Sequence, residues 1–246
     1  MRTEGPPMSP NGASSFHAWW EPPPTGLVAV SAVLEVQNLP SVSSLYFWAM
    51  QVDFVSADGT QFGGGHIGLQ WNKAHPASRA VNWGGYASQY LGGHVLTGSE
   101  SELPSANQDP NTRDYMWYPH RAYQLVVARG SEPNSWRGVI ADLETHDIVT
   151  IREINCEGEF LAAATVWTES FADCDAPSVT VSWSDLRGRL VDGREVGPPQ
   201  VLASFHPSDR GGCDNTNTVV DHGHIFQTTN TERTTAPDST LKLAEI

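Results

Sequence analysis

The chain has few positive charges and no long apolar run, and both absences limit the kinds of partner that it could bind. Its 246 residues include 14 Lys and Arg against 28 Asp and Glu, which gives a formal net charge of -14. Such a balance repels phosphate backbones, so we predict no nucleic-acid partner. No apolar stretch approaches the length of a membrane span, which predicts no membrane association. The opening segment, MRTEGPPMSPNGASS, lacks the apolar centre of a secretion signal. We therefore expect a cytoplasmic protein, or a secreted one if a signal has been removed.

Cysteine is also scarce. The three cysteines, Cys156, Cys174 and Cys213, form no CxxC pair and no zinc-finger spacing, so a structural zinc is not expected. Cys174 and Cys213 both lie in loop-like sequence next to Asp, and a disulfide between them is one possibility. Free thiols are the default for a chain without an export signal.

Regular helical periodicity is missing as well, whereas aromatic residues are plentiful, with nine Trp, six Tyr and eight Phe. Short segments of alternating or continuous apolar character are separated by Gly, Pro, Asn, Asp and Ser. This pattern predicts an all-β fold of two packed antiparallel sheets. Residues 1–14 are rich in Pro, Gly and Ser and predict a flexible tail, so residues 15–246 are expected to form a single β-sandwich domain.

Residues 46–72 contain two alternating segments joined by Asp58-Gly59, a favoured hairpin turn. A turn centred there pairs positions whose numbers add to 117, so Gln51 lies opposite His66. The apolar positions, which share the core side, are Tyr46, Trp48, Met50, Val52, Phe54, Ile67, Leu69 and Trp71. The other side is polar but almost uncharged, whereas a solvated surface usually carries Lys and Glu.

We therefore expect the polar side of this hairpin to bind a ligand. Amide and carboxylate groups supply both donors and acceptors, as recognition of a neutral polyhydroxylated molecule or glycan requires. Neighbouring strands are expected to add stacking rings and a further amide. No cofactor is predicted, and the oligomeric state is left open. The candidate ligand-binding residues are Gln51, Asp53, His66, Gln70 and Asn72 from the hairpin, with Asn82, Trp83 and Trp167 from other strands.

An enzyme on the same scaffold is the alternative hypothesis. A glycan hydrolase or lyase, or a small-molecule cyclase or isomerase, would use Asp53, His66 or Glu169. Glycoside hydrolysis needs two acids within roughly 5 to 10 Å of each other, and His66 is a candidate proton carrier. A third alternative is an interaction protein without a small-ligand site, marked by an apolar outer patch.

Two other polar sets have the spacing of possible sites. Asp142, Glu144 and His146 have the spacing of one strand face, but they fall where a second hairpin must turn, and turns favour polar residues. His222 and His224 have a spacing used by metal sites, which Asp221, Cys213 or His206 could complete. No established metal-binding or catalytic motif accompanies either set, and we predict no metal.

The chain resembles an uncharacterised group of bacterial sandwich proteins related to the concanavalin-A-like lectin and glucanase superfamily. The likeness is carried, over residues 16–228, by FWAMQVDF, GHIGLQW, YQLVVARG, WRGVIADLETHDIVTI, VWTESFADC and VTVSW. It implies a jelly-roll sandwich with a concave ligand-binding face. The glucanase members carry a Glu-x-Asp-x-x-Glu strand, and here Ile140 stands in place of the leading Glu before Asp142. The resemblance therefore transfers no catalytic residue.

Overall fold

A computed structural model describes residues 1–88 and 93–243 of the chain. It confirms the prediction of an all-β, two-sheet antiparallel jelly-roll sandwich, and every strand pair among the described residues is antiparallel. The first sheet contains β16 (Ser239–Lys242), β13 (Gln200–Phe205), β1 (Ser14–Glu21), β10 (Phe160–Ser170), β3 (Tyr46–Val55), β4 (Gln61–Trp71), β5 (Arg79–Ala87) and β6 (Thr112–Asp114), in that order. The second contains β14 (Thr216–Asp221), β15 (His224–Thr229), β11 (Thr180–Leu190), β2 (Leu27–Val36), β7 (Ala122–Arg129), β8 (Ser135–Asp142) and β9 (Ile148–Asn155), with β12 (Glu195–Val196) beside β11. Short 3-10 turns occupy Pro76–Ser78 and Ser208–Arg210.

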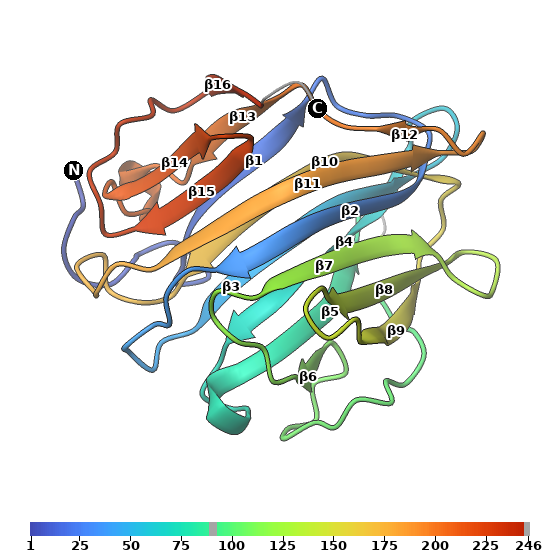
Figure 1. Cartoon of the computed structure of the whole chain (residues 1–246), viewed down its shortest axis with the longest axis horizontal. Helices are drawn as coiled ribbons and strands as arrows, with labels where there is room; N and C mark the ends of the chain where they lie inside the picture. Colours follow the sequence, from blue (N-terminus) through green and yellow to red (C-terminus); the bar gives the residue numbers. More distant parts are fainter. Residues whose placement is uncertain (89–92, 244–246) are drawn as a thin grey trace.

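The two sheets form stacked layers (Figure 1). A single pairing, Leu161 of β10 with Leu27 of β2, joins them at one point. Each sheet turns one side toward the other, and the facing side chains form the core. Along β3 every second side chain points into this core, because neighbouring residues of a strand point to opposite faces. Tyr46, Trp48 and Met50 are therefore fully enclosed.

The register of the β3–β4 hairpin is the predicted one, but its turn is not. From Tyr46–Trp71 to Phe54–Gly63 the paired numbers add to 117. At the turn, however, Ser56 pairs with Thr60, and the three residues between them include Gly59 with φ +86°. A positive φ suits Gly and gives a three-residue hairpin loop. An irregularity between Phe54 and Val55 then restores the predicted register.

Trp83 corrects one predicted site residue. Its strand pairs it with Ile67, so its indole points into the core and is fully buried. The ring rests on glycines from both layers: a Cβ at Gly65 of β4 would meet Trp83 Cη2 at 2.7 Å, and a Cβ at Gly138 of β8 would collide with the same indole. Trp83 therefore packs the two sheets together and does not face a ligand site.

The segment before β1 is attached to the domain, whereas the sequence predicted a flexible tail. Residues 1–13 contain no strand, but the backbone N–H of Met8 donates to Gly211 O, and that of Cys174 donates to Gly5 O. Ala13 is 1% exposed. These contacts satisfy backbone groups that a free tail would leave to water.

Cys174 and Cys213 form a disulfide, so the default expectation of free thiols is wrong for this pair. The loops before β11 and β14 bring the two together across 39 residues of sequence. Cys156 remains a free, buried thiol. Disulfides are more typical of oxidising compartments than of the cytosol, which departs from the cytoplasmic expectation. Among the described residues, no helix has the length and apolar character needed to cross a membrane.

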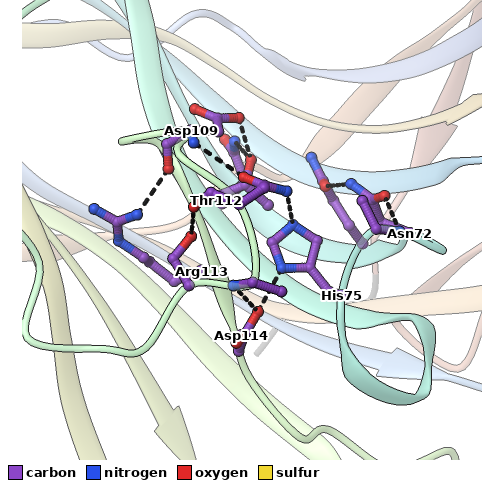
Figure 2. Close-up of polar contacts among 12 residues, drawn as sticks. Asn72, His75, Asp109, Thr112, Arg113 and Asp114 are labelled. Atoms are coloured by element: carbon purple, nitrogen blue, oxygen red, sulfur yellow. Dashed lines mark hydrogen bonds and ion pairs between the residues drawn. The ribbon is translucent and has the colours of Figure 1, made fainter.

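The loop before β6 is fixed by a polar network at the end of β4 and β5 (Figure 2). His75 Nδ1 lies 2.6 Å from Asp114 Oδ1, and its Nε2 lies 3.0 Å from Asn107 Nδ2. Asn111 O accepts a hydrogen bond from the Trp83 N–H, and Pro110 O accepts one from Arg152 of β9. The loop thus connects an edge of the first sheet with an edge of the second.

Candidate functional site

The outer side of the first sheet, here called the candidate face, contains most of the predicted site residues. On β3 and β4 it presents Phe47, Ala49, Gln51, Asp53, His66, Gly68 and Gln70, and Gln51 is paired with His66 as predicted. Trp167 and Glu169 of β10 lie on the same side, as do Asn82, Gly84 and Tyr86 of β5. Strand parity therefore gathers candidates from four neighbouring strands.

Cross-strand pairing arranges these side chains in rows. One row runs from Glu169 through Phe47 to Gln70, because Phe47 pairs with both. The next row runs from Trp167 through Ala49 and Gly68 to Asn82. Since adjacent strands are about 4.8 Å apart, the Cα atoms of Glu169 and Gln70 are separated by about 10 Å. Phe47 lies between these two polar side chains, and Gln70 is 6% exposed.

Aromatic rings fill the middle of the candidate face. The ring centroids of Phe47 and Trp167 are 5.0 Å apart, and His66 contacts both, at 5.5 and 6.3 Å. His17 of β1 lies on the other side of Trp167, at 5.7 Å. Phe47 and Trp167 are only 5% and 7% exposed, so they form a packed apolar floor. Tyr86, by contrast, is 54% exposed.

Both acids on this face are shifted toward their neutral forms. Desolvation raises the pKa of Glu169, and a hydrogen bond from Asn11 Nδ2 (2.9 Å) offsets part of that effect. Desolvation likewise raises the pKa of Asp53, with Gln61 opposing it. Among the described residues neither acid has an ion-pair partner. A carboxyl that is partly desolvated and unpaired holds its proton more readily than one in water.

The two histidines are shifted toward their neutral forms as well. Burial lowers the pKa of His66 to about 4, although the carboxylate of Asp109 acts in the opposite direction. Burial lowers the pKa of His17 to about 4, and the nearby His206 adds to this effect. Both imidazoles are therefore uncharged at neutral pH, and each can offer one donor and one acceptor.

The amides of this face are held by local hydrogen bonds. Gln70 Oε1 accepts from Asn72 Nδ2 at 2.9 Å, which leaves the Nε2 group of Gln70 to donate elsewhere. Asn82 Nδ2 donates to Thr112 Oγ1, and Thr112 donates in turn to Asp109 Oδ2. Figure 2 shows Thr112 beside Asp109 in this chain of contacts. Asn72, predicted as a ligand residue, thus supports Gln70 at the end of β4.

The three predicted catalytic groups do not converge. Asp53 is six residues along β3 from Phe47, the partner of Glu169, so about 20 Å of strand separates the two carboxyls. That distance exceeds the roughly 5 to 10 Å required of a glycosidase pair, and a glycoside hydrolase based on Asp53 and Glu169 is ruled out. The bulky Phe47 also stands between His66 and Glu169.

The other polar sets have structural roles. Asp142 and Glu144 both form ion pairs with Arg121, and Asp142 Oδ1 accepts from two backbone N–H groups of the hairpin turn. His222 is 91% exposed beside Asp221 at the β14–β15 turn, and Cys213 is consumed in the disulfide. Within residues 1–88 and 93–243, no group of three or more His, Cys, Asp and Glu side chains could hold a metal ion.

Sequence reasoning missed three residues of this site. His17 and Trp19 alternate with the buried Phe16, Ala18 and Trp20, so the parity argument used for residues 46–54 would have placed them outward. Asn11, the partner of Glu169, lies outside any strand and gave no such signal.

Comparisons with known proteins identify no family. No protein-family model matches the chain, and no curated protein matches its sequence. Scytalido-glutamic peptidase with a peptide-based transition-state analog is 14% identical, covers 87% of this chain and 97% of its own, and has a TM-score of 0.47. SCP-B, an Eqolisin-family peptidase in complex with the tripeptide Ala-Ile-His, is 12% identical, with coverages of 87% and 96% and a TM-score of 0.44. Peanut lectin with a nonapeptide is 10% identical, with coverages of 90% and 74% and a TM-score of 0.30.

Proposed function

We propose that this protein hydrolyses peptide bonds, with the Glu169 carboxyl as its acid–base group and the Gln70 amide as the donor that stabilises the oxyanion. The observation that carries this proposal is the row Glu169–Phe47–Gln70, in which a carboxyl with a raised pKa and no ion-pair partner lies across Phe47 from a supported amide. Carboxyls with a perturbed pKa and no ion-pair partner are a feature of functional sites. Peptidase activity is also named for the scytalido-glutamic peptidase, but the proposal rests on the side chains of this chain.

The reaction needs only water as a second reactant. The Glu169 carboxylate takes a proton from water while the water oxygen attacks the peptide carbonyl carbon. Gln70 Nε2 donates a hydrogen bond to the oxygen that becomes negative, as in other oxyanion sites. The C–N bond then breaks, and the proton held by Glu169 passes to the departing amine, so that a carboxylic acid and an amine are released.

A single acid with an amide fits acyl hydrolysis better than glycoside hydrolysis. Glycosidases need a second carboxyl near the first, and Asp53 is about 20 Å away along the strand. Asn72 holds Oε1 of Gln70 and so orients its Nε2 group.

A peptide library tests this function. Wild-type protein is incubated with internally quenched fluorescent octapeptides between pH 3 and 8, and we expect cleavage of a subset. Glu169→Gln, which preserves shape but cannot accept the proton, should lower kcat by a factor of about 1000. Glu35→Gln is the matched control, because Glu35 is also a half-buried strand residue but lies on β2 of the other sheet.

Two results would overturn the proposal: no library peptide is cleaved by wild type, or Glu169→Gln turns over peptides as fast as Glu35→Gln. Circular dichroism of the three proteins checks that each is folded.

Binding of a neutral polyhydroxylated ligand or glycan is the second candidate function. The exposed ring of Tyr86 and the amide of Gln51 favour it, since sugars use stacking and hydrogen bonds together. The nearly closed ring of Trp167 and the inward direction of Trp83 remove two of the predicted stacking surfaces. A glycan array with wild type and Tyr86→Ala tests this candidate, which fails if no glycan is retained.

A further inference from the structure

A pocket lies beyond the Glu169 end of the site. Its volume is about 630 Å³, and its lining includes Arg2, His206, Ser208, Asp209 and Arg210. The N-terminal segment forms one wall, because the Met8 N–H donates to Gly211 O next to these residues. The other wall is formed by His206 to Gly211 of the connection between β13 and β14, and Figure 1 shows this connection near the N-terminus.

The pocket continues the row that contains the proposed reacting groups. The N–H of His206 donates to Ser15 O of β1, and Ser15 pairs with Glu169 of β10. His206, Ser15, Glu169, Phe47 and Gln70 therefore follow one another across the sheet. Two strand spacings, about 10 Å, separate His206 from Glu169. The N-terminal segment links the two places, because Pro10 lines the pocket and Asn11 donates a hydrogen bond to Glu169.

The charge of this pocket differs from that of the chain as a whole. The chain carries a formal charge of -14, whereas the pocket is lined by two arginines and one acid, Asp209. Neither guanidinium forms an ion pair among the described residues. The nearby Asp214 carboxylate accepts from the backbone N–H of Arg2 rather than from its guanidinium. Two unpaired arginines in one pocket favour an anionic group, which guanidinium binds through charge-assisted hydrogen bonds.

We propose that this pocket is a substrate subsite that selects an Asp or Glu side chain about three residues from the bond that is cleaved. The spacing follows because an extended chain advances about 3.4 Å per residue, so about 10 Å corresponds to three residues. The inference deepens the proposed peptide hydrolysis and rests on it for the identity of the substrate.

Charge reversal tests the subsite. A cleaved octapeptide is resynthesised with Glu, Gln or Lys at each position in turn, and kcat/KM is measured for each peptide. We expect wild type to prefer Glu over Lys by about tenfold at one position, three residues from the scissile bond, and less elsewhere. Arg210→Glu should reverse that preference at this position alone, and Arg210→Gln should abolish it.

Arg194→Glu is the matched control, because Arg194 is exposed and pairs with Asp192 in the turn between β11 and β12. It should retain the wild-type preference. If Arg210→Glu also retains it, or if Arg194→Glu reverses it, the subsite is wrong. Thermal unfolding checks that the Arg210 variants remain folded, which is expected for an exposed residue in a short turn.

Binding separates failure of the subsite from failure of the proposed function. Fluorescein-labelled Glu and Lys peptides are titrated with Glu169→Gln protein, with and without Arg210→Glu. Charge-dependent binding without cleavage by wild type supports the subsite and overturns the hydrolytic function. Cleavage without any charge preference overturns the subsite alone, and absence of both binding and cleavage overturns both.

Discussion

The two sheets treat the carboxylates on their outer faces in opposite ways. On the second sheet, Glu153 accepts hydrogen bonds from Arg137, Ser131 and Ser135. Partial burial alone would raise its pKa, but these donors lower the pKa below its usual value. On the first sheet, Glu169 receives one hydrogen bond, from Asn11, and desolvation raises its pKa.

This difference separates a stabilising role from a chemical one. A carboxyl whose folded pKa is lowered favours the folded state above its unfolded pKa, whereas one whose pKa is raised disfavours it there. Glu153 therefore stabilises the sandwich at neutral pH, and Glu169 opposes folding at the same pH. A residue that weakens the fold where it stands is a better candidate for function than one that strengthens it.

The largest predicted effect is a double dissociation between these two acids. Glu169→Gln should lower the kcat of peptide hydrolysis by a factor of about 1000 and leave the free energy of unfolding at pH 7 unchanged or higher. Glu153→Gln should leave turnover unchanged and lower that free energy by about 2 kcal/mol, because several donors lose a charged acceptor. Turnover and urea denaturation measure the two effects. A loss of stability in Glu169→Gln as large as that in Glu153→Gln would remove the contrast.

The second predicted effect concerns Gln70, which lies in the same row as Glu169. Gln70→Ala should lower kcat by about 100-fold with little change in KM, since the amide acts on charge that develops in the transition state. Asn72→Ala removes only the support of Oε1 and should cost less. Steady-state kinetics of both variants give the comparison. A rise in KM at constant kcat would assign Gln70 to substrate binding.

Acid should lower the free energy of unfolding through the two buried histidines of the candidate face. The folded pKa values of His17 and His66, about 4, lie below the ordinary value of 6.5. Their contribution to stability is therefore complete above pH 6.5 and is lost as the pH falls from 6.5 toward 4. The free energy of unfolding of His66→Gln should fall less between pH 7 and 4.5 than that of wild type, by about 1 kcal/mol after allowance for partial solvent exposure.

Exposed His222 supplies the control for this measurement. His222→Gln should follow the wild-type pH dependence. An equal change in His66→Gln and His222→Gln would show that burial of His66 does not govern the loss.

The smallest predicted effect is a shift of the pH profile through Asn11. Its hydrogen bond lowers the pKa of Glu169, against the larger effect of desolvation. Asn11→Ala should therefore raise that pKa further and move the corresponding limb of the kcat/KM profile to higher pH, by roughly half a unit. Asn107→Ala, in the loop before β6, should leave this limb in place. A shift to lower pH in Asn11→Ala would contradict the assigned contact.

Local pairing explains what could be predicted from the sequence. The β3–β4 register agrees with the one predicted from side-chain parity, although the turn has three residues and an irregularity between Phe54 and Val55 restores the register. The pairing of Gln51 with His66 was therefore accessible. Which of Asn82 and Trp83 faces outward could not be predicted from the sequence. Adjacent strand residues face opposite ways, and the connection before β5 contains left-handed residues, Ala77 and Ser78, that hide its register.

Non-local contacts account for what sequence reasoning could not supply. The pairing of β3 with β10 spans more than 100 residues and contains a register shift between Ala162 and Thr165, so the row joining Glu169 to Gln70 could not be derived from spacing. The Cys174–Cys213 disulfide likewise depends on two loops that only the folded sandwich brings together.

The close packing of Trp83 against Gly65 and Gly138 has a consequence for how these positions can evolve. Neither glycine leaves room for even one methyl group against the indole, and a Cβ at Gly65 would also meet Phe54 Cζ at 2.8 Å, so a larger residue at 65 or 138 requires a change in the rings that it meets. Among homologues, a Leu or Val at position 83 should accompany Ala or Ser at 65 and 138, and this covariation would mark a change in how closely the two layers approach each other.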